Sequence, residues 1–195
     1  MLDIIAVTYG HTDILKCFIN SIKAQTCSDW RLVLIHDGIN EELREDLENN
    51  GYVDQEKVVF VEHPTRTKNY GHILRTYALE HLLKNEFVLL TNGDNYYVPT
   101  MVETVSKHME DHDFIYFDCV HNYDIVVNHN KSSYGYLDCR LEITKIDMGC
   151  VVVRSDLAKG YEFDLRIAAD WRYFRKILSL DPRVIKIDKI LFVHN

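Results

Sequence analysis

The sequence has few prolines and no long run of apolar residues. Only three prolines occur among 195 residues, and hydrophobic residues make up 47% of the chain, which excludes a disordered, proline-rich polypeptide. The longest apolar runs are far shorter than the roughly 20 residues that a membrane-spanning helix needs. The first residues also lack a basic segment followed by an apolar signal core, so we expect a cytoplasmic protein without a membrane span.

Basic residues are outnumbered by acidic ones. The chain has 22 Lys and Arg against 30 Asp and Glu, which gives a formal net charge of −8. Because binding to a nucleic-acid backbone depends on clustered Lys and Arg, we expect no nucleic-acid partner. No basic amphipathic face for a membrane surface is evident either.

The cysteines lack the spacing of a metal or disulfide framework. They are five in number, and none forms a CxxC pair, which argues against a disulfide-stabilised fold and against a zinc site. Buried thiols are the expectation. The cysteines are Cys17, Cys27, Cys119, Cys139 and Cys150.

Strand-like and helix-like segments alternate along the first half of the chain. The expected strands are residues 4–9, 31–36, 58–62 and 87–90, and the expected helices are residues 14–22, 41–49 and 73–82. Repeated units of this kind predict a mainly parallel, Rossmann-like sheet flanked by helices. The length suits a single α/β domain, with residues 1–97 as the nucleotide-binding half and residues 98–195 as the other half.

The second half is less regular. We expect helices at residues 98–108 and 168–178, strands at residues 114–120 and 149–154, and a terminal strand or hairpin at residues 184–193. Residues 123–141 are polar and rich in tyrosine, which is typical of a binding loop or of a small antiparallel insertion. No repeat, low-complexity segment or linker is present.

One apolar run ends on a cluster of oxygen-bearing side chains. Residues 87–91 deliver Asn92, Asp94 and Asn95 to the carboxyl end of a strand, where open α/β sheets bind their ligands. A carboxylate at Asp94, with an amide oxygen two residues earlier, suits a hard divalent cation that in turn binds a diphosphate. The same residue types are common in turns, so a simple strand-end turn is the alternative.

Several short segments, spread along nearly the whole chain, together match the order of motifs in a known protein family. The segments are Ile5 to His11, His36-Asp37-Gly38, Asn69-Tyr70-Gly71 with Arg75, Asn92-Gly93-Asp94, Asp147-Met148-Gly149 and Ala169-Asp170-Trp171. In this order they resemble the glycosyltransferases of family two, in which Asn92-Gly93-Asp94 would be the Asp-x-Asp element. The resemblance implies the GT-A fold and transfer of a sugar, with inversion, from a nucleotide-diphosphate sugar, most often UDP-linked, to a glycan or other hydroxyl acceptor.

The resemblance implies a donor site at the first strand ends. Asp37 would accept a hydrogen bond from a uracil-like NH, while the backbone at Thr8 and Tyr9 would bracket the base. Gly71 would allow close approach of a phosphate, which the guanidinium of Arg75 would reach. Asp37 could instead serve only a turn, and Arg75 could be a solvated helix charge.

The resemblance also implies a cation site. Asp94 would be the direct ligand, Asn92 would lie near the donor ribose or the metal, Gly93 would line the donor site, and His194 would complete the ligand set. An imidazole ligand favours Mn²⁺ over Mg²⁺, whereas Asn92 in place of an aspartate removes one negative charge and weakens cation binding. His194 could instead be an incidental terminal residue. The remaining histidines, including His121, show no ligand spacing.

Asp170 is the predicted general base. It lies near the start of the helix at residues 168–178, where it could deprotonate the acceptor hydroxyl as this attacks the anomeric carbon from the face opposite the diphosphate. Capping the helix is the alternative role. Glu162 and Asp164 are neighbouring candidates, while Asp147 is expected to shape the acceptor pocket and Trp171 to pack in the core or under a sugar.

Two other classes of protein stay open. A non-catalytic nucleotide-sugar or glycan-binding module is credible because of Asn92. A sugar-phosphate nucleotidyltransferase would share the strand–helix half and the carboxylate–metal chemistry, but residues 8–12 lack the glycine-rich, basic phosphate loop that such an enzyme needs. The short chain favours a single sugar addition over processive synthesis, and its ending after His194 is equally consistent with a domain of a longer protein.

Overall fold

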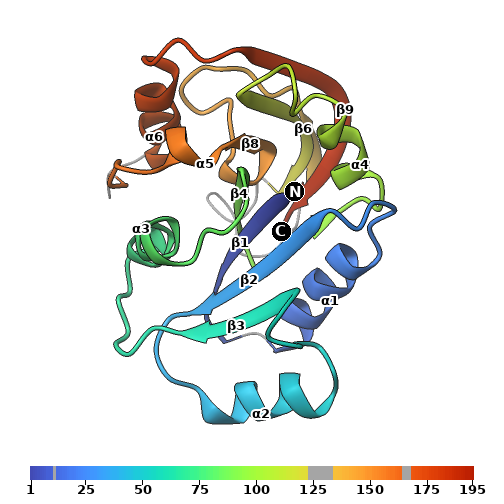
Figure 1. The fold of residues 1–195 in the computed structure, drawn as a ribbon, viewed down its shortest axis with the longest axis vertical. Coiled ribbons are helices and arrows are strands. Elements are labelled where there is room, and N and C mark those ends of the chain that lie inside the picture. The colour runs from blue at the N-terminus through green and yellow to red at the C-terminus, as the bar shows by residue number, and fades with distance from the viewer. Residues whose placement is uncertain (11, 123–133, 164–167) are drawn as a thin grey trace.

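One curved sheet runs through the protein, and helices lie on both sides of it (Figure 1). The computed structural model describes residues 1–10, 12–122, 134–163 and 168–195. The first half consists of β1 (Leu2–Thr8), α1 (Thr12–Lys23), β2 (Trp30–His36), α2 (Glu41–Asn49), β3 (Val58–Glu62), α3 (His72–His81) and β4 (Phe87–Asn92). The second half consists of β5 (Tyr96–Tyr97), α4 (Met101–Ser106), β6 (Phe114–Asn122), β7 (Tyr134–Leu137), the 3₁₀ turn η1 (Met148–Cys150), β8 (Val151–Arg154), α5 (Ser155–Ala158), α6 (Ala169–Leu178) and β9 (Val184–His194).

The four long strands of the first half form a parallel wing in the order β3-β2-β1-β4. Nearly every residue of β1 and β2 is buried, because strands that helices cover on both sides are apolar on both faces. In Figure 1, α1 and α3 lie on opposite sides of this wing. The predicted Rossmann-like half is confirmed. Val7 pairs with Asn92 and Thr8 with His36, so the carboxyl ends of β1, β2 and β4 meet at one edge.

The second half extends this sheet with strands of both directions. β8 runs antiparallel to β4 and β6, and β9 runs parallel to β6. The short β5 and β7 run antiparallel to β9 and β6. The predicted antiparallel part is therefore present, and it includes the described end of the polar stretch at residues 123–141.

Some predicted boundaries differ from the structure. The helix expected at residues 98–108 is shorter, Met101–Ser106. Residues 149–150 lie in η1 instead of a strand, because the Asp147 carboxylate accepts a hydrogen bond from the Gly149 amide at 2.8 Å and favours a turn there. The C-terminal segment is one continuous strand, not a hairpin, and it pairs with β6 from Phe114 opposite Val184 to His121 opposite His194.

Three of the five cysteines are buried as expected, namely Cys119, Cys139 and Cys150. Cys17 on α1 is exposed and Cys27 is half-buried, so the expectation is wrong for these two. Cys119, Cys139 and Cys150 bring their sulfur atoms within 4.8 Å of one another in the core of the second half.

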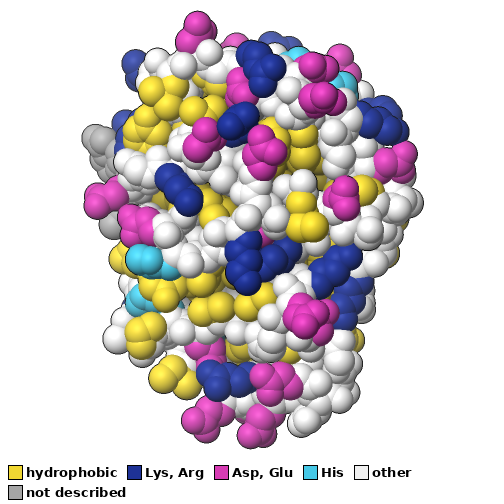
Figure 2. Space-filling view, in the orientation of Figure 1, with side chains coloured by type: hydrophobic (Ala, Val, Ile, Leu, Met, Phe, Trp, Pro, Cys, Tyr) yellow, Lys and Arg dark blue, Asp and Glu magenta, His cyan; other side chains and the backbone are white. Residues whose placement is uncertain are grey.

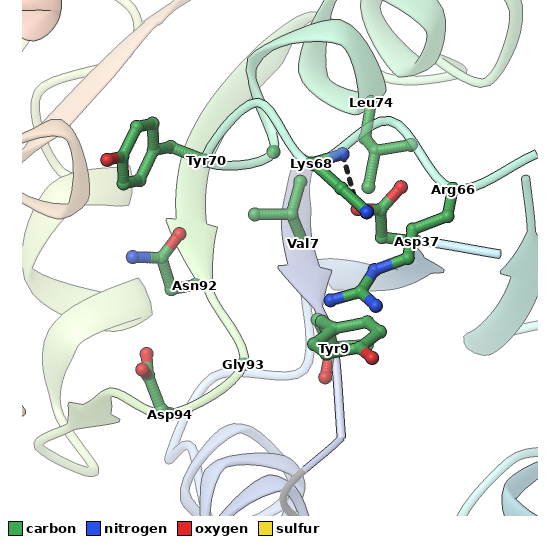
Figure 3. Close-up of a pocket in the computed structure, with 12 residues that line it drawn as sticks. Val7, Tyr9, Asp37, Arg66, Lys68, Tyr70, Leu74, Asn92, Gly93 and Asp94 are labelled. Atoms are coloured by element: carbon green, nitrogen blue, oxygen red, sulfur yellow. Dashed lines mark hydrogen bonds between the residues drawn. The ribbon is translucent and has the colours of Figure 1, made fainter.

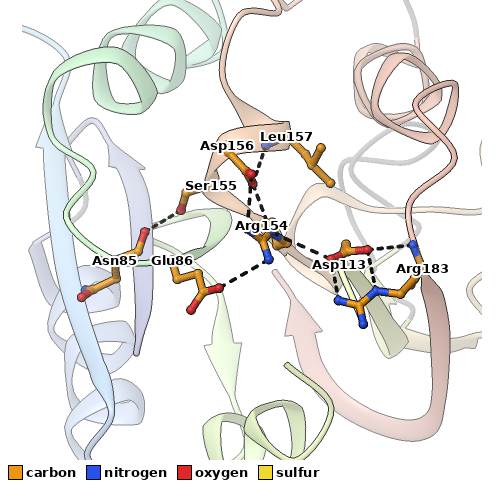
Figure 4. A network of polar contacts seen from close by, with 8 residues as sticks. All are labelled: Asn85, Glu86, Asp113, Arg154, Ser155, Asp156, Leu157 and Arg183. Atoms are coloured by element: carbon orange, nitrogen blue, oxygen red, sulfur yellow. Dashed lines mark hydrogen bonds and ion pairs between the residues drawn. The ribbon is translucent and has the colours of Figure 1, made fainter. Parts of the chain in front are cut away.

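A polar network joins four strands at the edge of the sheet opposite the ends of β1 and β4 (Figure 4). The Arg183 guanidinium donates hydrogen bonds to both oxygens of Asp113, at 3.0 Å and 2.9 Å, which ties the start of β9 to the start of β6. Ser155 donates to the carbonyl of Asn85 at 2.7 Å, which ties the end of β8 to the start of β4. This network stabilises the second half far from the strand ends described next.

The surface shows no continuous basic area on the face drawn in Figure 2, where acidic and basic side chains are interspersed with apolar ones. This distribution agrees with the net charge of −8. Within the described part of the chain, no helix has both the length and the apolar character needed to cross a bilayer.

Candidate active site

A cavity of about 400 Å³ opens at the carboxyl ends of β1, β2 and β4 (Figure 3). It is lined by Val7, Thr8, Tyr9, Asp37, Arg66, Lys68, Tyr70, Gly71, Leu74, Asn92, Gly93 and Asp94. The structure therefore brings together every residue that the sequence placed in the donor site, except Arg75. We call this space the donor cavity.

Asp37 holds the wall of the donor cavity in place. One carboxylate oxygen accepts hydrogen bonds from the amide and hydroxyl of Thr67, at 2.6 Å and 3.0 Å, and the other accepts from the amide of Lys68 at 3.1 Å. Burial opposes ionisation of Asp37, but these hydrogen bonds outweigh it and lower the pKa. Asp37 is therefore more than a turn residue, because it fixes the segment that leads into α3.

Two basic residues of that segment, Arg66 and Lys68, were missed by the sequence analysis. The Arg66 guanidinium lies 3.8 Å from the centre of the Tyr9 ring, and Tyr9 also stacks on His36 with ring centres 5.9 Å apart. Figure 3 shows Arg66 and Lys68 on the Asp37 side of the cavity. In a chain of net charge −8, two cations at a strand-end cavity favour an anionic ligand.

Gly71 is required by the shape of the cavity wall. Its φ is +73°, a left-handed conformation at the start of α3. A β-carbon added at Gly71 would lie 2.5 Å from a methyl group of Val7. The glycine therefore permits the close packing of α3 against the end of β1, as well as any close approach of a ligand.

Arg75 is a buried charge and not a solvated helix residue. Only 3% of the residue is exposed, and its guanidinium donates to the carbonyl of Tyr70 at 2.9 Å and to the side-chain oxygen of Asn92. Burial lowers the pKa of Arg75, whereas the carboxylates of Asp170, Asp147 and Asp94 raise it. Arg75 therefore serves as the cation among three acids, one helical turn behind Gly71.

A second, smaller cavity of about 190 Å³ adjoins the donor cavity. We call it the inner cavity, and it is lined by Tyr70, His72, Arg75, Thr91, Asn92, Asn95, Asp147, Met148, Gly149, Asp170 and His194. Tyr70 and Asn92 line both cavities, so a ligand in the donor cavity lies next to the acids of the inner cavity.

Asp170 lies at the start of α6 and faces the inner cavity. Its carboxylate accepts a hydrogen bond from the amide of Met148 at 3.0 Å, not from the first turn of its own helix. The N-cap position belongs to Ala168, which adopts a φ of +61°. Burial raises the pKa of Asp170 to about 6, and the neighbouring Asp147 adds to this, against the opposing charge of Arg75. A carboxyl group with such a pKa suits general base catalysis near neutral pH.

His121, Asp147 and His194 gather at the edge of the inner cavity. Each histidine places its Nε2 3.8 Å from the same carboxylate oxygen of Asp147. The two rings are stacked, with centres 4.3 Å apart and planes inclined by 12°. Burial lowers the pKa of His121, the neighbouring His194 lowers it further, and the carboxylate of Asp147 opposes both effects.

The expectation that His121 lacks ligand spacing is wrong. Among the described residues, the His, Cys, Asp and Glu groups whose ligand atoms lie within 4.8 Å of one another in threes are the cysteine cluster and the His121–Asp147–His194 triad. Asp94 belongs to neither group, although it lines the donor cavity beside Asn92. His194 is therefore not an incidental terminal residue, since it is the last paired residue of β9.

Other candidates lie elsewhere. Glu162 lines a different cavity, against α3, and Asp164 lies outside the described residues. Trp171 is half-buried against the core.

The family comparison agrees with the motifs. The family model for glycosyl transferase family 2 matches residues 3–167, a range that contains the whole donor cavity and Asp147. The chain therefore belongs to glycosyl transferase family 2. No curated protein matches the chain in a sequence search.

Solved structures share the fold at low sequence identity. The crystal structure of S. aureus TarS matches 100% of this chain and 36% of its own, with a TM-score of 0.74 and 16% identity. TarS 1-349 in complex with UDP-GlcNAc matches over 98% of this chain and 57% of its own, with a TM-score of 0.72 and 17% identity. The mannosyltransferase PcManGT from Pyrobaculum calidifontis, in complex with GDP-Man and Mn²⁺, matches over 99% of this chain and 56% of its own, with a TM-score of 0.72 and 17% identity. The predicted GT-A fold is confirmed, and the chain spans only part of the length of each of these proteins.

Proposed function

We propose that the protein is an inverting glycosyltransferase that takes a sugar from a nucleotide-diphosphate sugar and passes it to a hydroxyl group of a glycan or another acceptor. The observation that carries this proposal is the shared wall of the two cavities. Asn92 and Tyr70 separate a cavity that suits a nucleotide from one that contains a carboxyl group of raised pKa, Asp170. Donor and base are therefore adjacent.

The donor cavity suits a nucleoside diphosphate. A uracil-like base would lie near Tyr9, where the ring stack and the Arg66 guanidinium offer flat surfaces. Asp37 retains acceptor capacity beyond its hydrogen bonds to Thr67 and Lys68, which suits a base NH. Arg66 and Lys68 would offset the phosphate charges. UDP-GlcNAc in a TarS complex and GDP-Man in the PcManGT complex are nucleotide-sugar donors of this class, and we propose a UDP-sugar here.

The reaction would proceed by direct displacement. The acceptor hydroxyl gives its proton to the Asp170 carboxylate while its oxygen attacks the anomeric carbon. The bond between that carbon and the diphosphate oxygen breaks on the opposite face, so the configuration inverts. Arg75 would hold Asp170 near its working pKa, because its buried positive charge lowers the pKa of that carboxyl group.

A divalent cation, Mn²⁺ or Mg²⁺, would offset the charge that develops on the leaving diphosphate. The residues present suit such an ion, since Asp94 lines the donor cavity and His194 lines the adjoining inner cavity, and they offer an oxygen and a nitrogen ligand. Asn92 lines both cavities, so it would lie between the donor and the base. Its amide oxygen accepts a hydrogen bond from Arg75. We propose residues 1–97 as the donor half and residues 98–195 as the acceptor half.

A non-catalytic nucleotide-sugar-binding module is the second candidate, and Asn92 in place of an aspartate is the observation that favours it. Both candidates bind the donor, but only the enzyme turns it over. A donor hydrolysis and transfer assay with UDP-sugars and Mn²⁺ separates them. The transferase is supported if Asp170→Asn binds donor like the unaltered protein and loses at least 100-fold in turnover. Equal turnover in both proteins, or none in either, would contradict the role of Asp170. Release of pyrophosphate from a nucleoside triphosphate and a sugar phosphate would instead indicate a nucleotidyltransferase.

A further inference from the structure

We propose that a groove along the outer side of α3 is the acceptor subsite, and that it takes an uncharged, hydroxyl-rich saccharide in preference to an anionic one. The acceptor role rests on the proposed function, whereas binding of a saccharide to the groove does not. The groove has a volume of about 440 Å³, within the range of roughly 300 to 1,000 Å³ that is usual for small-molecule sites. We call it the α3 groove, and the residues that line it include His72, Ile73, Tyr77, Glu80, Glu162 and Phe163.

The α3 groove adjoins the inner cavity. His72 lines both spaces, and Asp170 lines the inner cavity. The donor cavity in turn shares Tyr70 and Asn92 with the inner cavity. The three spaces therefore form a series, in which a saccharide in the α3 groove is separated by a single side chain from the cavity of the predicted base.

One wall of the α3 groove is a single face of the helix. Ile73, Tyr77 and Glu80 follow one another at helical spacing. Ile73 is 42% exposed and Tyr77 is half-buried, so the two form an apolar strip that suits the C–H face of a sugar ring. With a rise of about 1.5 Å per residue, the face spans about 12 Å from His72 to Glu80, which exceeds the width of one sugar ring.

The facing wall is held by a stack of three aromatic rings. Phe163 stacks on His72, with ring centres 5.3 Å apart and planes inclined by 13°, and on Tyr173, with values of 4.2 Å and 16°. Tyr173 is fully buried, and its hydroxyl donates to the carbonyl of Ala158 at 2.7 Å. The stack therefore holds Phe163 against α3 and preorganises the groove. A ligand there would contact both halves of the chain.

His72 is a neutral hydrogen-bonding group at the junction with the inner cavity. Burial and, to a smaller extent, the charge of Arg75 lower the pKa of His72 to about 4, so the imidazole is uncharged at pH 7. The Arg75 guanidinium lies 3.4 Å from Nδ1, and because a guanidinium only donates, Nδ1 accepts and Nε2 carries the proton. Such an imidazole suits the oxygen of a sugar hydroxyl and offers no charge attraction to a phosphate.

The charge of the α3 groove selects against anions. Glu80 on the helix and Glu162 on the facing wall both line it, and none of its described lining residues is Lys or Arg. Carboxylates accept hydrogen bonds from sugar hydroxyls but repel phosphate and carboxylate groups. The donor cavity has the opposite character, because Arg66 and Lys68 line it. The two spaces therefore favour an anionic donor and an uncharged acceptor.

The test measures saccharide binding by saturation-transfer difference NMR, with saturating UDP and Mn²⁺ and again without them. The probes are maltose, cellobiose, lactose and chitobiose, and the 6′-phosphate of each. We expect at least one disaccharide to bind, and its phosphate to bind at least about fivefold more weakly. Tyr77→Ala should weaken disaccharide binding at least about fivefold, and Glu80→Lys should narrow or reverse the preference over the phosphate. Glu45→Lys, the same change at an exposed residue of α2, is the matched control and should bind like the unaltered protein.

Three results would overturn the proposal. They are no binding of any disaccharide under either condition, tighter binding of the phosphates by the unaltered protein, and binding that Tyr77→Ala and Glu80→Lys both leave unchanged. Tyr77→Phe, which keeps the ring, guards against loss of folding, and circular dichroism checks each variant.

The assay records binding and not transfer, so it is separate from the test of the proposed function. Disaccharide binding with the expected variant pattern, in a protein that turns over no donor, would remove the transferase and the acceptor role. The saccharide site on α3 would stand in that case.

Discussion

Arg75 donates a hydrogen bond from its guanidinium to the side-chain oxygen of Asn92, and both residues line the inner cavity that contains Asp170. The arginine is almost fully buried, and the carboxylates of Asp170, Asp147 and Asp94 raise its pKa. Asn92 gives it a neutral acceptor where an aspartate would add a fourth negative charge. The residue that looks like a defect in the Asp-x-Asp pattern is therefore part of the charge balance of the site.

Removal of Arg75 is expected to disturb both stability and proton affinity. Arg75→Met keeps most of the side-chain volume but leaves the buried carboxylates without their cation, which costs about 3 kcal/mol in the free energy of unfolding. The pKa of Asp170 should also rise above its value of about 6, because Arg75 lowers it. Chemical denaturation and the pH dependence of turnover measure the two effects. Arg75→Lys, which retains the charge, should show a smaller change in both.

The pH dependence of activity should report Asp170. A base must be deprotonated to accept the acceptor proton, so turnover should rise about tenfold per pH unit below a pKa of about 6 and level off above it. A cation bound next to Asp147 would move this midpoint to lower pH, because positive charge favours the carboxylate. Measurement of kcat/KM between pH 4.5 and 8 gives this pH profile. A profile that is flat through this range would contradict the assignment.

The same group should make the protein less stable at neutral pH. The pKa of Asp170 is about 6 in the folded state against a usual value of 3.8, so the folded state holds the extra proton between these values. Stability therefore falls as the pH rises from about 4 to 6, and the loss is complete above the folded pKa. Asp170→Asn removes this cost while retaining an acceptor for the Met148 amide.

We expect Asp170→Asn to raise the free energy of unfolding at pH 8 by about 1 to 3 kcal/mol. Thermal denaturation of the unaltered protein and the variant at pH 4 and pH 8 tests this. The difference between them should shrink at pH 4, where the unaltered aspartate is protonated. A variant that is destabilised at pH 8 would show that the carboxylate is held more strongly than its raised pKa implies.

Gly71 should tolerate no side chain. Gly71→Ala forces a β-carbon to within 2.5 Å of Val7 and places alanine at a φ of +73°, which together cost about 2 to 4 kcal/mol. Because α3 carries Arg75 and its first turn borders the donor cavity, nucleotide binding should weaken as well. The double variant Gly71→Ala with Val7→Ala should recover part of the loss, since it removes the methyl groups that clash.

Arg183→Met serves as the control for Gly71→Ala. It breaks the contact with Asp113 at the opposite edge of the sheet, so it should lower stability slightly and leave nucleotide affinity unchanged. Equal loss of affinity in both variants would mean that Gly71 acts only through overall stability. Isothermal titration with UDP compares the two.

The parallel half of the fold could be predicted because each of its buried strands is a continuous run of mainly apolar residues in the sequence. The donor cavity followed from the same pattern, since polar residues such as Asp37 and Asn92 come directly after these runs. The register of β6 against β9 could not be predicted in this way. It is set by contacts between segments about 70 residues apart, so the pairing of His121 with His194 was not visible from spacing along the chain.

The burial of individual charged side chains was the other property that could not be predicted from the sequence. Arg75 lies on α3, and its charge is enclosed only because α3 packs against β1 and β2 and the guanidinium contacts Asn92 at the end of β4. Arg66 and Lys68 occupy a segment without regular structure, whose path depends on the hydrogen bonds to Asp37. Such segments follow from tertiary contacts more than from local sequence.

The donor cavity is proposed to bind a nucleotide-diphosphate sugar together with a metal ion. The most direct test is a thermal-shift panel of UDP, GDP and their common sugars, each with Mn²⁺, Mg²⁺ or a chelator, since a specific ligand stabilises the folded state by mass action. We expect a shift with one nucleotide family, largest with Mn²⁺ and reduced by the chelator and by Asp94→Ala. No shift with any nucleotide, in the presence of either metal, would contradict it.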